Sequence, residues 1–167
     1  AAGRDLDPRG VYRRRCGDIF EQAVALTLQH EGGYINDPAD PGGETRYGIS
    51  KRAFPKVDIA NLTINKAKAI YKAFYWERGP HLIKHPSLAA KYFDLCVNAG
   101  VSRASKWLQE ASNLFGAALA IDGVVGPVTA EYINRYPHPE ALLCALKGLA
   151  FNHYVNINKP RFLAGWL

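Results

Sequence analysis

The sequence contains no methionine, no C-x-x-C pair, and no apolar run close to the roughly 20 residues that span a membrane. We therefore expect no cysteine-based metal site, membrane span or signal peptide within these 167 residues. A chain without methionine lacks its initiating residue, so we expect that something upstream of Ala1 was removed, with an export signal or anchor left open. Repeats, low-complexity segments and an alternation of strands with helices are also missing, which argues against a doubly wound sheet.

The cysteines are few, and their count is odd. Cys96 and Cys144 lie in apolar helical patterns, where we expect buried thiols. Cys16 lies in a polar segment and is therefore the candidate for a reactive or regulatory thiol.

The charge is strongly positive, with a net charge of +6 and a pI near 9.3. Basic proteins favour polyanions such as nucleic acid, anionic lipid surfaces and bacterial envelope polymers. No recognised nucleic-acid motif is present, so we expect no nucleic-acid partner. Residues 1–17 have no apolar periodicity and predict a basic tail. Its arginines are Arg4, Arg9, Arg13, Arg14 and Arg15.

Apolar residues recur at helical spacing in most of the chain, and this predicts a mainly α protein. Capping residues are expected to open the first four helices, which end near residues 31, 76, 100 and 115. Prolines at the first helical position open a short helix and a long one that runs to about residue 158. The predicted caps are Asp18, Thr63, Ser87 and Ser102, and the prolines are Pro127 and Pro139.

The remaining segments predict a small β element and a turn. Residues 34–50 are rich in glycine and proline, which predicts a hairpin with Thr45-Arg46-Tyr47 as one strand. Residues 51–62 predict a short helix around Arg52-Ala53-Phe54 and then a loop. Asp122-Gly123 predicts a turn.

The stretch between the first helix and this hairpin carries the chemistry. Glu31 ends a helix, where the dipole does not stabilise its charge, so poor hydration would raise its pKa as a general acid requires. Asp40 lies in a polar turn and should stay ionised, and the Thr45 hydroxyl can position a water. Two carboxylates in contrasting surroundings are what glycosidic bond hydrolysis requires. Each residue alone also has a purely structural explanation.

Two other readings of this stretch fail on spacing. A zinc peptidase helix needs a second histidine four residues after His30, and that position is Tyr34. The acidic residues and prolines of 37–43 do not match the spacing of an EF-hand calcium loop. We therefore expect no metal and no cofactor.

The run H-E-G-G-Y-x-N-D-P-x-D-P-G-G-x-T-x-x-G-I-S, residues 30–50, closely resembles glycoside hydrolase family 108. The resemblance implies a lysozyme-like, two-lobed α+β fold and an N-acetylmuramidase of the endolysin type. It also implies that Glu31 is the general acid, Asp40 the base or electrostatic stabiliser, and Thr45 the water-positioning partner. In phage T4-type lysozymes five residues separate Asp from Thr, whereas four do here, and Asp37 competes for the role of Asp40.

A second run, from Ala104 to Thr129, resembles the peptidoglycan-binding region that follows the catalytic part in this family. We therefore expect a tail at 1–17, a catalytic region at 18–100, and a peptidoglycan-binding helical region at 101–167 on the same body. The expected partner is peptidoglycan, the expected state a monomer, and the expected location the periplasm or cell envelope after export or release. The alternative is a wall-binding or secretion-assisting protein without turnover.

Four residues are candidates for substrate binding. Tyr34 and Tyr47 offer flat aromatic faces for pyranose rings. Asp94 and Asn98 lie one helical turn apart, so both can face one groove. Tyr75 and Trp76 either line the cleft or close the core at a helix end.

Overall fold

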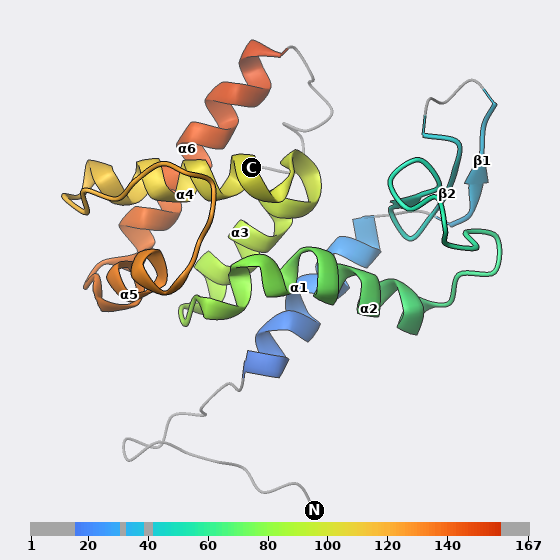
Figure 1. Ribbon diagram of the computed structural model, residues 1–167, viewed down its shortest axis with the longest axis horizontal. Coiled ribbons are helices and arrows are strands. Elements are labelled where there is room, and N and C mark those ends of the chain that lie inside the picture. The colour runs from blue at the N-terminus through green and yellow to red at the C-terminus, as the bar shows by residue number, and fades with distance from the viewer. Residues whose placement is uncertain (1–15, 31–32, 39–41, 158–167) are drawn as a thin grey trace, which may run out of the picture.

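A computed structural model describes residues 16–30, 33–38 and 42–157 (Figure 1). Over these residues the fold is mainly helical, with one small antiparallel sheet, as predicted. The elements are α1 (Cys16–His30), β1 (Ile35–Asn36), β2 (Glu44–Arg46), β3 (Ile49–Ser50), α2 (Ile64–Phe74), η1 (Trp76–Arg78), η2 (Pro80–Leu82), α3 (Pro86–Ala99), α4 (Val101–Leu114), α5 (Pro127–Arg135) and α6 (Pro139–Asn156). None of these helices is long and apolar enough to cross a membrane.

The small lobe is a sheet of three short strands in the order β1-β2-β3. The predicted hairpin is therefore part of a larger unit, in which Thr45 of β2 lies opposite Ile35 on one side and Ser50 on the other. Tyr47 and Gly48 form the two-residue turn between β2 and β3, with φ of 52° and 75°. Positive φ at both positions is the signature of a type I′ turn, whose twist matches that of the strands.

Residues 51–62 form turns, so the short helix predicted around Phe54 is wrong. The backbone N–H of Phe54 donates to Ser50 O, and that of Val57 donates to Phe54 O. Pro55 gives the physical reason, because a proline disfavours the helical conformation of the residue before it.

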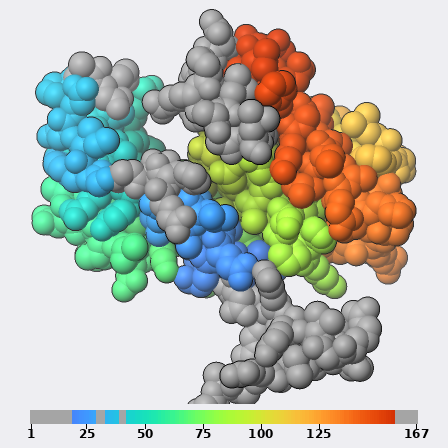
Figure 2. All heavy atoms as spheres, turned by 180° about the vertical axis from the view of Figure 1, so that it is seen from behind, coloured from blue at the N-terminus to red at the C-terminus, as the bar shows by residue number. Residues whose placement is uncertain are grey.

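The helical lobe is built around α3, which packs against α1, α4 and α6. Phe20 of α1 makes aromatic contacts with Trp76 and Phe93, whose rings also contact each other. Trp76 is only 3% exposed and closes the core. Figure 2 shows the small lobe, in cyan, and the helical lobe as two masses with a hollow between them.

Several helix ends differ from the prediction by about two residues. Thr63 caps α2 as predicted, because its hydroxyl accepts from the N–H of Lys66. The α3 cap is His85 rather than Ser87, since its ring nitrogen accepts from the N–H of Leu88. Gly100 ends α3 and begins α4 at once, so Ser102 lies inside α4.

The first helix and the last two complete this comparison. α1 begins at Cys16, which places Asp18 inside the helix. Pro127 and Pro139 open α5 and α6 as predicted. Of the tail predicted at 1–17, residues 1–15 lie outside the described residues, and Cys16 and Gly17 begin α1.

The two described thiols have different surroundings. Cys96 is buried, as predicted, but Cys144 is exposed, so that prediction is wrong. α6 is apolar on most sides, and Cys144 lies roughly opposite its buried face. That face consists of Leu142, Leu146, Ala150 and Tyr154.

Candidate active site

The candidate site begins where α1 ends and the small lobe starts. α1 ends at His30, directly before Glu31, and Glu31 and Asp40 both lie outside the described residues. Thr27, one helical turn before Glu31, is 9% exposed, and its hydroxyl donates to Ala23 O over 3.2 Å. The residue one turn before the predicted general acid is thus nearly buried, and its side-chain hydrogen bond stays within α1.

Thr45 is the predicted catalytic residue that the structure describes. It is half-buried in the middle strand, and its Oγ1 donates to Gly43 O at 3.4 Å. A hydroxyl that donates one hydrogen bond keeps its oxygen lone pairs for a second partner. The side chain can therefore accept a hydrogen bond from a water.

Tyr34 is associated with the opposite face of the sheet. Its hydroxyl donates to Glu44 Oε1 at 3.2 Å, and the Tyr34 ring is 44% exposed. Successive strand residues point to opposite faces, so Glu44 projects away from the side of Thr45. Lost solvation and the Glu44 carboxylate raise the pKa of Tyr34. The structure therefore does not bring Tyr34 and Thr45 together on one face.

Tyr47 is held tightly, in a conformation that non-glycine residues rarely adopt. Its carbonyl accepts a 2.7 Å hydrogen bond from the hydroxyl of Tyr71, a residue of α2 that is 1% exposed. The Arg46 guanidinium lies 5.4 Å from the centre of the Tyr47 ring. These contacts fix the turn two residues after Thr45 against the helical lobe.

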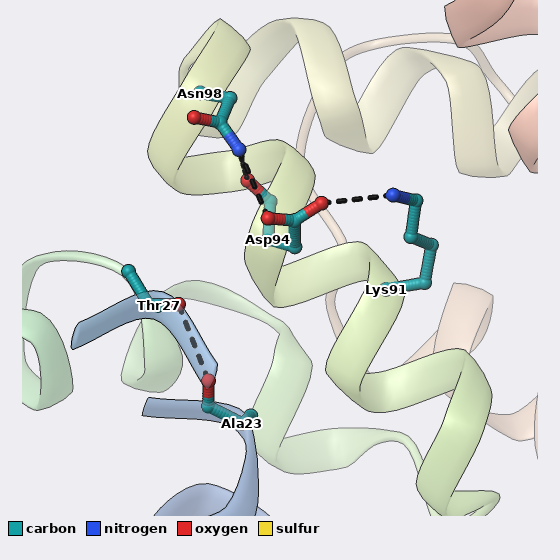
Figure 3. Close-up of polar contacts among 5 residues, drawn as sticks. All are labelled: Ala23, Thr27, Lys91, Asp94 and Asn98. Atoms are coloured by element: carbon teal, nitrogen blue, oxygen red, sulfur yellow. Dashed lines mark hydrogen bonds and ion pairs between the residues drawn. The ribbon is translucent and has the colours of Figure 1, made fainter. Parts of the chain in front are cut away.

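Asp94 and Asn98 face the same side of α3, as predicted (Figure 3). Asn98 Nδ2 donates to Asp94 Oδ1, and Lys91 Nζ forms an ion pair with Asp94 Oδ2, both at 2.9 Å. We call Lys91, Asp94 and Asn98 the α3 polar row. Asp94 is held from both sides by its own helix, so its carboxylate has a fixed orientation.

Some residues of this region were missed by the sequence reasoning. The Lys91–Asp94 ion pair could have been predicted from the sequence, because residues three apart on a helix are neighbours. The contacts of Tyr71 with Tyr47 and of Glu44 with Tyr34 join residues 24 and 10 positions apart, and no local pattern indicates them.

The second motif forms a loop tied to α4. Gln109 donates to Asp122 Oδ1 and Val124 O, and accepts from the N–H of Gly123. Asp122 Oδ1 also accepts a hydrogen bond from the N–H of Val124. The bond from Gln109, and after it the bond from Val124, lower the pKa of Asp122. Gly123 has a φ of 81°, which confirms the predicted turn.

Within the part of the chain that the structure describes, no group of three or more His, Cys, Asp or Glu side chains could hold a metal ion.

The fold of the chain is similar to that of a solved structure. The structure of SagA from Brucella abortus matches the chain with a TM-score of 0.63 and 25% identity, covering 85% of this chain and 88% of that one. The fold is accordingly lysozyme-like, with a small β lobe beside a helical lobe.

A family model matches the same region. Residues 24–100, a little under half of the chain, match the family model described as glycosyl hydrolase 108. The match ends at Gly100, so the second motif lies beyond it. A comparison with curated proteins gives no match. The matched model is that of a family of glycoside hydrolases.

Proposed function

We propose that the protein is a peptidoglycan hydrolase that cleaves the β-1,4 bond between N-acetylmuramic acid and N-acetylglucosamine. The observation that carries the proposal is the family match over residues 24–100, which spans the end of α1, the small lobe and the α3 polar row. The lysozyme-like fold agrees with it.

The proposed mechanism uses two carboxyl groups and a hydroxyl. Protonated Glu31 donates to the glycosidic oxygen while Asp40 acts as base or stabilises the oxocarbenium-like charge. Thr45 positions water, which its half-buried location and its donor bond to Gly43 support. No cofactor takes part.

Four residues are proposed to contact the glycan. The α3 polar row presents a fixed carboxylate and an amide, Asp94 and Asn98, suited to sugar hydroxyl groups and N-acetyl groups. Tyr47 offers a ring beside Thr45. Tyr34, with Glu44, is assigned to a more distant part of the chain of sugars because it faces away from Thr45.

Residues 101–167 are proposed to hold the wall. The support within the described residues is the ordered loop around Asp122, whose backbone is tied to Gln109 while the Val124 side chain remains 66% exposed. We propose a monomer that acts in the periplasm or cell envelope after export or release, as a bacteriolytic, endolysin-type muramidase.

The first test compares wild type with Glu31→Gln on purified peptidoglycan and follows new reducing ends. We expect wild type to release them, and the variant to fall by about a hundredfold or more while still sedimenting with the wall, because loss of a general acid costs about 10²–10⁴ in rate. If wild type binds the wall but releases no reducing ends, the chain is the non-catalytic wall-binding protein instead.

The identity of the second carboxylate needs its own comparison. Asp40→Asn and Asp37→Asn differ from wild type by the same chemistry three residues apart. We expect the first to abolish release of reducing ends and the second to leave most of it. The reverse result would assign the role to Asp37.

A further inference from the structure

The positive charge of the described chain is concentrated at one end of the molecule. Residues 44–78 contain eight Lys or Arg against three Asp or Glu, whereas residues 79–157 contain six against five. The first range covers the strands β2 and β3 of the small lobe and the helix α2 that follows them. A field of one sign on one lobe favours an anionic partner there.

The exposed cations gather where the 51–62 turns meet α2. An edge-to-face contact between Phe54 and Phe74, with ring centres 5.1 Å apart, joins the turns to the C-terminal end of α2. Arg52 and Lys56 lie two residues on either side of Phe54 and are both exposed.

Two lysines complete this group. Lys51 Nζ donates to Val57 O, which keeps its side chain on the turns. The pKa of Asp58 is lowered by its hydrogen bonds to Asn61 and, further, by the charges of Lys51 and Lys66, so both lysines lie near this carboxylate. The basic-aromatic patch is Lys51, Arg52, Lys56, Lys66 and Phe74.

Phe74 distinguishes this patch from a purely ionic one. Its ring is 50% exposed and contacts the ring of Phe54, which lies in the chain between the exposed cations Arg52 and Lys56. A polyanion that carries no rings, such as a polyphosphate, gains little from an exposed phenyl ring. A lipid surface gains from both groups, because cations attract anionic headgroups while an aromatic ring enters the headgroup boundary.

We propose that the basic-aromatic patch binds the surface of an anionic phospholipid bilayer, with the lysine and arginine side chains on the headgroups and Phe74 in the interface. The chain would lie on the membrane without crossing it. This attachment does not rest on the hydrolase assignment, since the patch shares no residue with the candidate active site.

The test is co-sedimentation of the full chain with vesicles of phosphatidylglycerol and phosphatidylcholine, or of phosphatidylcholine alone, at about 0.1 M salt, where the Debye length is about 10 Å. The matched variants R52Q/K56Q and K84Q/K147Q remove two exposed charges each, from the patch and from the helical lobe. One cation near an anionic surface changes partitioning about fivefold, so we expect about a 25-fold loss for the first. The second should stay within about twofold of wild type, because charges more than a Debye length away are screened.

A second pair isolates the ring at constant charge. Phe74→Ser should weaken binding to the anionic vesicles, while Phe74→Leu, which keeps an apolar side chain, should retain most of it. Both variants keep the basic N-terminal segment, so its contribution is the same throughout. Circular dichroism melts report whether each variant folds.

Three results would overturn the proposal. Wild type could bind anionic vesicles no better than phosphatidylcholine, or R52Q/K56Q could bind as well as K84Q/K147Q. If R52Q/K56Q weakens binding but Phe74→Ser does not, the patch attracts anions by charge alone and Phe74 does not enter the interface. Because no glycan substrate is present, none of these results depends on hydrolysis.

Discussion

Removal of the Tyr71 hydroxyl should lower both the free energy of unfolding and the rate of reducing-end release. The Tyr71 hydroxyl donates to Tyr47 O at 2.7 Å from a side chain that is 1% exposed. A typical intramolecular hydrogen bond contributes about 1 kcal/mol, and a buried carbonyl left unpaired costs about 1–3 kcal/mol. Tyr47 is only half-buried, so we expect Tyr71→Phe to lower the free energy of unfolding by about 1–2 kcal/mol.

The effect on activity follows from the backbone at Tyr47. Its φ of 52° costs about 1–3 kcal/mol and persists only while the surroundings hold it. Without the hydroxyl the turn can relax, and Thr45, two residues earlier, moves with it. A misplacement of 1 Å costs about a hundredfold in rate. We therefore expect reducing-end release to fall by about 10- to 100-fold.

The control is Tyr75→Phe, the same change one turn later on the chain. The Tyr75 ring lies 5.9 Å from that of Tyr71, and its hydroxyl makes no hydrogen bond to the described residues. Denaturant melts and initial rates on peptidoglycan should separate the two variants. Equal losses in both, or an unchanged rate in Tyr71→Phe, would refute the role given to this bond.

Two further tests concern the packing of Gly79 against Tyr92 and the loop around Asp122. Gly79→Ala places a Cβ 2.5 Å from the Tyr92 hydroxyl at a φ of 147°, so we expect the free energy of unfolding to fall by about 2–4 kcal/mol. As a control, Gly126→Ala meets no atom within 4 Å and should change the free energy of unfolding by less than about 0.5 kcal/mol in the same denaturant melts. The fold lowers the pKa of Asp122 below its ordinary value of about 3.9. The charged side chain therefore stabilises the folded state at pH values above about 3.9, and this stabilisation is lost as the pH falls through the lowered pKa. The difference in Tm between wild type and Asp122→Asn should therefore be present at pH 7 and vanish in strong acid, and a constant difference would contradict this linkage.

Helices were predictable because periodicity and proline placement are local signals. Pro127 and Pro139 fixed two helix starts correctly. The errors arose where two signals competed. Ser87 is a good cap by type, but Pro86 before it already occupies the first helical position and moves the cap to His85. Cys144 was misplaced because a helix that is apolar on most sides does not indicate which side is buried.

The candidate site divides in the same way. Asp94 and Asn98 were predictable as a pair because residues four apart share a helix face, and their 2.9 Å hydrogen bond confirms this neighbourhood. The strand register between β1 and β2 brings Tyr34 to Glu44. This contact lies on the face of the sheet away from Thr45. Register is set by pairing between segments and cannot be read from either one alone.

The position of Thr45 is therefore a property of the whole body. Strands of two or three residues form a sheet that has little stability by itself. Its orientation comes from Ile49, which is 1% exposed in the common core, and from bonds of Arg46 to Ala60 and of Tyr71 to Tyr47. Sequence identifies a threonine with suitable chemistry near two carboxylates. The helical lobe decides where its hydroxyl lies, which is why a substitution on α2 is expected to change catalysis in the sheet.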